Sequence, residues 1–365
     1  MQGNPTAGAA RLPERTMPVP PGALERLPKW LICIPLALQW LYLALRYGSA
    51  SLPSCANPAI TAGGLVGEGK LEYFVAMGAT ARHATARHCA ISTHRIASPA
   101  ELLQMMHDAA LVFPVIAKPD LGLCGFGVRK IDDLAALQRY VAAFPPNETV
   151  VLQEYLAQDG EASIFYARHP GAEKGDIIGL ALRHFPQVTG DGRRSVAELI
   201  SADVRAGRLL GSTQHECVAD MRAVPPAGKT VRLSTIGSTR VGGLYRDGRD
   251  CITAQLTQVI DAIARDMPAF HFGRFDVRFD SLAALARGRG FKIMEINGAG
   301  SEAIQAWDPT IGLFEGFRII FTKQHRLFDI GAAMRATGVK PIGVRTLFML
   351  NRRQQRLIAQ YPPSN

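Results

Sequence analysis

The sequence predicts an α+β fold with two lobes, and three observations lead to this prediction. A chain of 365 residues with 47% hydrophobic and 20% charged side chains is long enough to bury the cores of two or three lobes. Short apolar strands separated by glycine-rich or polar turns recur between residues 113 and 166. Residues 273–280 alternate between apolar and charged side chains, as a strand with one buried face does. Helical patterns lie mainly towards the ends of the chain.

Basic charge gathers at the two ends. The net charge is +10; residues 1–50 hold five basic and two acidic side chains, residues 311–365 hold nine and two, and residues 51–310 hold 27 of each. A nucleic-acid-binding protein more often spreads this charge over its fold, and no zinc-finger spacing or aromatic-basic pattern is present. We therefore expect no nucleic-acid partner, whereas an anionic surface suits the basic ends.

The amino-terminal part of the chain divides into two predicted segments. Residues 1–29 are rich in proline and lack periodicity, so we expect a flexible arm. Residues 30–60 are apolar, and the run from Leu31 to Leu45 spans about 23 Å as a helix, short of the roughly 30 Å of a hydrocarbon core. Aromatic and basic residues over 30–46 favour an interfacial helix. A helix buried in the protein or in its homo-oligomer and a signal peptide are the alternatives.

The carboxyl-terminal residues 311–365 are predicted to form a basic helical extension. Residues 343–361 set leucines among arginines at helical spacing, as in a basic amphipathic helix. This helix either contacts a membrane surface, together with residues 30–46, or is an ordinary solvated surface helix. The six cysteines form no CxxC pair, which fits reduced thiols in the cytoplasm, with the inner face of the membrane as the more specific alternative.

A strand, a glycine-rich loop and a second strand follow one another over residues 113–131. The first strand ends near Lys118, and the loop contains Gly122, Gly125 and Gly127. Glycines let backbone amides approach phosphate oxygens, and a lysine on the preceding strand neutralises their charge. An ordinary turn is the alternative. The stretch 64–70 resembles a P-loop, but Leu71 stands where Ser or Thr is required.

Three carboxylate or amide side chains lie on two later strands. Asp276 belongs to the alternating strand 273–280, and Glu295 and Asn297 point the same way from the apolar strand 291–298. Because buried carboxylates are rarely left unpaired and oxygen ligands suit a hard cation, these three residues are candidate Mg²⁺ ligands. Strands with charged edges are the alternative.

The order of these motifs resembles the ATP-grasp superfamily, as in D-alanine:D-alanine ligase. The resemblance covers residues 61–310 and implies a small lobe at about 90–156 and a larger metal-binding lobe at about 157–310. It departs from the family at the amino end, where the usual first lobe is truncated. The matching residues, in order, are Lys70, Lys118 with its glycine loop, Glu154, Glu161, Arg274 with Asp276, and Glu295 with Asn297.

The resemblance implies a role for each matching residue. Lys70 and Lys118 would hold the ATP phosphates, with Gly122, Gly125 and Gly127 closing over them. The adenine would be lined by Gln153, Glu154, Tyr155 and Leu156, and Glu161 would bind the ribose. Two Mg²⁺ ions, or Mn²⁺, would bind Asp276, Glu295 and Asn297. Arg274 and Lys118 would be catalytic, with backbone amides near Gly300 and Ser301 beside Arg274 at an oxyanion site.

Residues 180–200 resemble the ATP-grasp part of cyanophycin synthetase. Ser195 and Glu198 form a capping-box pattern within this stretch. The stretch is therefore either structural, as a turn and a capped helix, or it contacts substrate through Arg183 or Arg193.

The implied function is an ATP-dependent ligase that uses MgATP to join a small-molecule carboxylate to an amine or another nucleophile through an acyl phosphate. An ATP-grasp enzyme that makes a thioester or a phosphorylated product is one alternative. A membrane-associated ATP-binding regulatory protein without turnover is the other.

Overall fold

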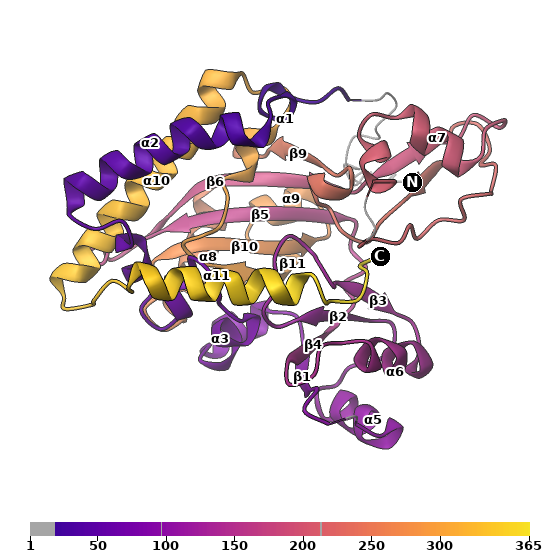
Figure 1. Ribbon diagram of the computed structural model, residues 1–365, viewed down its shortest axis with the longest axis horizontal. Helices are drawn as coiled ribbons and strands as arrows, with labels where there is room; N and C mark the ends of the chain where they lie inside the picture. The colour runs from indigo at the N-terminus through magenta and orange to yellow at the C-terminus, as the bar shows by residue number, and fades with distance from the viewer. Residues whose placement is uncertain (1–18, 96, 212–213) are drawn as a thin grey trace, which may run out of the picture.

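The computed structural model describes residues 19–95, 97–211 and 214–365. Figure 1 shows a small lobe below a larger central sheet, with long helices along one side of that sheet. Both main sheets are antiparallel, and helices pack on them rather than alternating with parallel strands. The predicted α+β fold is confirmed.

The small lobe is a four-stranded sheet with two helices. Its strand order is β1-β4-β2-β3, and its core contains Ile91, Val115, Leu137 and Leu152. Its elements occupy 88–154, against the predicted 90–156. They are β1 (His88–Ser92), α5 (Pro99–Asp108), β2 (Val115–Pro119), β3 (Arg129–Ile131), α6 (Leu134–Ala142) and β4 (Thr149–Glu154).

The larger lobe is built on a five-stranded sheet with the order β11-β10-β5-β6-β9. On β10, Phe275 and Val277 are fully buried on one face, because the apolar positions of this strand alternate as predicted. The helices over that face are α3, α4, α8 and α9. The strands are β5 (Gly160–Ala167), β6 (Asp176–His184), β9 (Leu244–Asp247), β10 (Phe272–Phe279) and β11 (Phe291–Asn297); the helices are α3 (Lys70–Val75), α4 (Ala79–Ala84), α8 (Ala254–Arg265) and α9 (Leu282–Ala286).

The other face of the large sheet is partly apolar and partly polar. Its apolar part packs against α10 (Leu313–Ala336), η6 (Ile304–Trp307) and η1 (Leu52–Cys55). Its polar part, which includes Arg274 and Asp276, faces the small lobe. The site therefore lies where helix cover ends and the two sheets meet.

The chain before the small lobe forms short helices rather than a further sheet. Between 48 and 87 these are η1, η2 (Thr61–Gly64), α3 and α4. Asn57 is fully buried, and its side chain makes hydrogen bonds with the backbone of Gly63, His271 and Phe272 at 2.8–3.1 Å. These bonds fix the segment to the start of β10.

The prediction of a flexible arm over 1–29 is wrong for the part that the structure describes. Residues 1–18 lie outside the described residues. From Val19 onward the chain is ordered against the body: α1 (Ala23–Arg26) buries Leu24, and Glu25 forms ion pairs with Arg205 and Arg208. Long-range pairing fixes a segment whose local composition favoured disorder.

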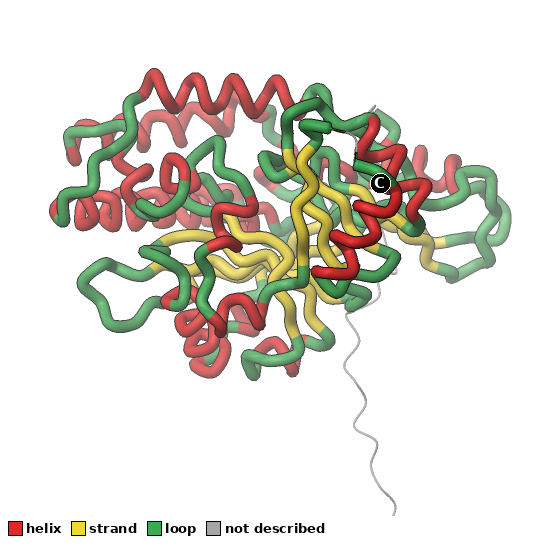
Figure 2. Tube along the Cα trace, turned by 90° about the horizontal axis from the view of Figure 1, so that it is seen from below, coloured by secondary structure: helices red, strands yellow, loops and turns green. Residues whose placement is uncertain are grey.

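The apolar run forms α2 (Lys29–Tyr47), which lies beside α10 (Figure 1). Figure 2 shows the strands in the middle of the molecule with helices around them. Among the described residues it is the one helix long and apolar enough to cross a membrane, judged by length and composition alone. Helices also form in the carboxyl-terminal extension, namely α10 and α11 (Val344–Ile358).

A small unit beside the large sheet holds the stretch that resembles cyanophycin synthetase. It contains β7 (Gln187–Thr189), α7 (Val196–Ala202), η3 (Ala206–Leu209) and β8 (Thr230–Arg232). Ser195 and Glu198 form the predicted capping box at the start of α7. The remaining short 3₁₀ helices are η4 (Thr239–Val241) and η5 (Arg249–Cys251).

Candidate functional site

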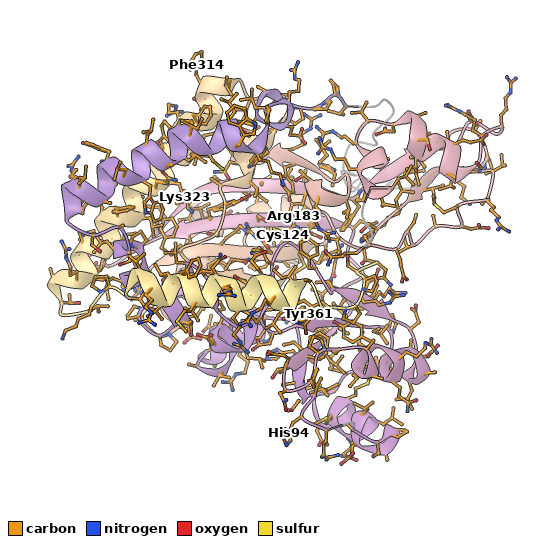
Figure 3. The ribbon with its side chains drawn as sticks, in the orientation of Figure 1. His94, Cys124, Arg183, Phe314, Lys323 and Tyr361 are labelled. Atoms are coloured by element: carbon orange, nitrogen blue, oxygen red, sulfur yellow. The ribbon has the colours of Figure 1, made fainter. Side chains whose placement is uncertain are left out.

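A cavity of about 270 Å³ lies between the small sheet and the large sheet. Both lobes, the glycine loop, the loop 235–238 and α11 contribute to its wall. Figure 3 labels two of its side chains, Arg183 from β6 and Cys124 from the glycine loop. Every site residue predicted from the sequence except Gly127 lines this cavity: Lys70, Lys118, Gly122, Gly125, Gln153, Glu154, Tyr155, Leu156, Glu161, Arg274, Asp276, Glu295 and Asn297.

Lys118 connects the two lobes. It lies on β2, is 4% exposed, and its Nζ donates to Gln153 Oε1 at 2.9 Å and to the Met294 carbonyl at 2.8 Å. Burial lowers the pKa of Lys118 to about 7. No carboxylate forms an ion pair with this ammonium among the described residues. An anionic ligand in the cavity would favour its charged form.

Lys70 begins α3 and reaches the same cavity from the other side. Its Nζ lies 3.5 Å from Glu295 Oε1 and 3.3 Å from the Asp120 carbonyl. A Cβ at position 122 would lie 2.7 Å from this Nζ, so Gly122 leaves the space that the lysine side chain occupies. Lys70 and Lys118 thus approach the cavity from separate elements.

The glycine loop is held by α11 and by the small lobe. Tyr361, labelled in Figure 3, donates its hydroxyl to the Leu121 carbonyl at 2.6 Å, and the Gln354 amide donates to the Gly122 carbonyl at 3.0 Å. At the other end, Tyr140 donates to the Gly127 carbonyl at 2.6 Å. Gly125 has φ +76°, a left-handed conformation that glycine adopts without strain.

We expect Gln354→Leu to loosen the glycine loop. The change leaves the Gly122 carbonyl without this donor, which costs about 1–3 kcal/mol, so the loop should open more often. Amide hydrogen exchange over residues 121–127 should become faster in the free protein. Gln355→Leu is the matched control, because the neighbouring Gln355 is exposed. Unchanged exchange in Gln354→Leu would show that α11 does not order the loop.

The four residues predicted at the adenine differ in what their side chains contact. Gln153 is bonded to Lys118 and to the Met294 carbonyl, so it holds the lysine. Glu154 forms an ion pair with Arg87 at 2.8 Å and accepts the Arg87 amide at 2.9 Å. Tyr155 lies under Lys130, with Nζ 5.3 Å from the ring centre. Their adenine role stays a prediction.

A network of buried ion pairs joins β5, β6 and β10. Glu161, 3% exposed, pairs with Arg183 at 3.0 Å and with Arg278 at 3.3 Å. Asp276 is fully buried and pairs with Arg183 at 3.2 Å and Arg274 at 2.7 Å, while the Ser163 hydroxyl donates to it at 2.6 Å. Burial alone would raise the pKa of Asp276, but the two guanidinium groups hold it below its usual value.

The three predicted metal ligands lie together. In the antiparallel pairing of β10 and β11, Asp276 is opposite Glu295 and Arg274 is opposite Asn297. The donors are two carboxylates and an amide oxygen, a set that fits Mg²⁺. The oxygens of Asp276 already accept bonds from Arg183, Arg274 and Ser163, so a cation there must displace part of this network. The described residues contain no metal-binding group of three or more His, Cys, Asp or Glu, and the metal role stays a prediction.

The predicted oxyanion amides are wrong. The Gly300 amide donates to the Gly64 carbonyl at 2.6 Å, and the Ser301 amide donates to the Gly298 carbonyl at 3.0 Å. Both donors are therefore taken by backbone carbonyls, one at the end of η2 and one in the turn after β11. Arg274 does line the cavity, but its Nε and Nη2 bind Asp276 at 2.7 and 2.9 Å.

Several cavity residues were not identified from the sequence, or were left undecided. Arg183 lies inside the site. Arg193 lies on an exposed turn, where its backbone amide donates to the Asp191 carboxylate at 2.9 Å. Glu68 lines the cavity, and its buried Oε2 has no hydrogen-bond partner among the residues that the structure describes. Burial raises the pKa of Glu68 to about 7. The one feature of the sequence that could have indicated a site role for Glu68 is its position two residues before Lys70.

The charges of the cavity wall nearly cancel. Five basic residues and six acidic residues line it, a formal net charge of −1. The basic residues are Lys70, Lys118, Arg183, Arg274 and Arg278, and the acidic ones are Glu68, Glu154, Glu161, Asp276, Glu295 and Glu302.

The fold and the cavity define a protein with a cavity lined by charged and polar side chains between two antiparallel sheets. No protein-family model and no curated protein matches the chain. Two similar solved structures are a bifunctional glutathione synthetase from Pasteurella multocida (15% identity, TM-score 0.35, covering 66% of this chain and 34% of that one) and the D-cycloserine synthetase DcsG (12% identity, TM-score 0.38, covering 71% and 70%). The chain thus spans about a third of the glutathione synthetase.

Proposed function

We propose that this chain is an ATP-grasp ligase, which uses MgATP to join a small-molecule carboxylate to an amine or a similar nucleophile through an acyl phosphate. The observation that supports this most is the placement of Lys70, Lys118 and the paired strands β10 and β11 around one cavity between two sheets. In-line phosphoryl transfer needs charge neutralisation and positioning more than covalent chemistry from the protein. The cavity contains side chains suited to both.

Each lobe has a part in the proposed mechanism. Lys118 and Lys70 neutralise phosphate charge from opposite sides, and the glycine loop, held by Gln354, excludes water above them. Bound MgATP supplies the phosphoryl group that activates the carboxylate. Asp276, Glu295 and Asn297 are proposed to hold one or two Mg²⁺ ions against the phosphates, with Arg274 released from Asp276 to bind the activated carboxylate.

The test is ADP release by the purified protein with MgATP and pools of amino acids and other carboxylic acids. Glu295→Gln is the informative variant, because the Glu295 side chain is one-third exposed and Lys70, its partner at 3.5 Å, keeps its bond to the Asp120 carbonyl. ADP release that requires a carboxylic acid and is absent in Glu295→Gln supports the ligase. MgATP binding without turnover would favour a regulatory protein. ADP release without an amide product would favour an enzyme that makes a thioester or a phosphorylated product. No ATP binding would refute the proposal.

We further propose that Glu68 binds the acceptor and takes its proton. Its pKa of about 7 suits a general base, because such a group is ionised just above neutral pH yet still basic. Glu68→Gln should lower the rate with an amine acceptor about 100-fold. In the wild-type protein the rate should fall as the pH drops below about 7, since Glu68 is then protonated, and this acidic limb should be absent in Glu68→Gln.

The pH–rate profile distinguishes this role from a structural one. Glu72→Gln is the nearby control, because Glu72 caps α3 through the Gly69 amide and binds the Thr61 amide, so it should change stability and leave the acidic limb in place. An unchanged limb in Glu68→Gln would assign the proton transfer to another group.

A further inference from the structure

One face of α2 is apolar and exposed along the whole helix. Its large side chains are 39–75% exposed, and their spacing of three or four residues places them on one side of the helix. Contiguous exposed apolar patches of this kind mark contact surfaces. The residues include Trp30, Leu31, Ile34, Leu38, Leu41 and Leu45.

The opposite face of α2 is bound to the body of the protein. Ile32 and Leu43 are buried, and the Gln39 side chain donates to the Phe321 carbonyl at 3.0 Å. The Trp40 ring packs edge-on against the Phe328 ring, with 5.0 Å between the ring centres. Tyr47 is hydrogen bonded to Asp329. Helix α2 therefore lies along α10 over most of its length (Figure 1).

This attachment decides how α2 can meet a bilayer. Were α2 to cross the hydrocarbon, α10 beside it would enter too, together with its charged residues Arg318, Lys323 and Arg326. Charged side chains in hydrocarbon are costly. An orientation parallel to the membrane plane instead buries only the apolar face.

The ends of α2 carry the side chains of an interfacial helix. Lys29 and Trp30 lie at its start, and Tyr42 and Arg46 near its end, all of them exposed. Aromatic rings with polar groups favour the headgroup region, and the cations favour anionic lipid. No acidic residue occurs in α2. Two copies packed through this face would bring Lys29 or Arg46 against a cation of the other copy.

We propose that the protein binds the surface of an anionic bilayer through the exposed face of α2, with the helix lying flat in the interface. Phe314 at the start of α10 is 90% exposed and points away from the body in Figure 3. The proposal concerns a surface remote from the catalytic chemistry and does not rest on the proposed ligase activity.

Sedimentation with vesicles tests this proposal on the full chain. With vesicles of equal parts phosphatidylcholine and phosphatidylglycerol, the protein should pellet, and it should pellet less with phosphatidylcholine alone. Leu38→Glu combined with Leu41→Glu should lower the pelleted fraction about tenfold. Val75→Glu combined with Val112→Glu is the matched control, because both valines are about three-quarters exposed outside α2, and it should pellet like the wild type.

Three outcomes would overturn the proposal. Wild-type protein that stays in the supernatant would show that the face does not bind this lipid. Protein that resists an alkaline carbonate wash of the vesicles would indicate a spanning helix instead of a flat one. A dimer, detected by light scattering without vesicles and dissociated by the Leu38→Glu, Leu41→Glu change, would assign the face to a second copy. Circular dichroism melting of each variant verifies that it is folded.

Discussion

Lys118→Met is expected to lower kcat/KM for ATP by about 100- to 1,000-fold, the loss typical of removing one group that stabilises transition-state charge. Within the described part of the chain, no carboxylate forms an ion pair with this buried lysine, which is held at both lobes by Gln153 and Met294. Methionine keeps much of the side-chain volume and removes the charge. The measurement is steady-state ADP release over a range of ATP concentrations.

A control separates this effect from a general loss of positive charge. Lys340→Met removes a lysine from an exposed position outside the cavity and should leave kcat/KM unchanged. The Lys118→Met protein should still fold but melt somewhat below the wild-type temperature, because the buried Gln153 Oε1 loses its lysine donor, which costs about 1–3 kcal/mol. A kcat/KM within about threefold of wild type would show that Lys118 does not face the transferred phosphoryl group.

Asp276→Asn is expected to cost about 3–5 kcal/mol of unfolding free energy, as the removal of one partner from a buried ion pair does. The carboxylate is fully buried between Arg183 and Arg274, and asparagine leaves both guanidinium groups without its charge. ADP release should be lost as well, since the same carboxylate is a proposed metal ligand. Urea unfolding and the ADP assay measure the two effects separately.

Asp280→Asn is the matched control for this change. Asp280 follows directly after β10 and is exposed, so the same chemical change there should alter the unfolding free energy by less than about 0.5 kcal/mol. An Asp276→Asn protein as stable as wild type would show that the arginines find other partners. Retained ADP release would remove Asp276 from the metal site.

Local patterns predicted the elements that form the site. The alternation of β10 follows from the two-residue period of a strand, and the same period places Glu295 and Asn297 on one side of β11. The glycine loop is also a local feature. Gly125 and Gly127 adopt left-handed backbone conformations that few other residues tolerate, so glycines in the sequence mark this loop. Such rules depend on a few neighbouring residues.

Contacts between distant parts of the chain were decided by the tertiary structure. Arg183 pairs with Asp276 across 93 residues, and Gln354 bonds the glycine loop across 232. Glu25 is ordered by Arg205, which overturned the expected flexible arm. The sequence by itself determined the strands, the loop and the residue types of the site. Side-chain partners, the burial that sets the pKa of Lys118 and Glu68, and the packing of α2 along α10 depend on contacts between elements, which no local period encodes.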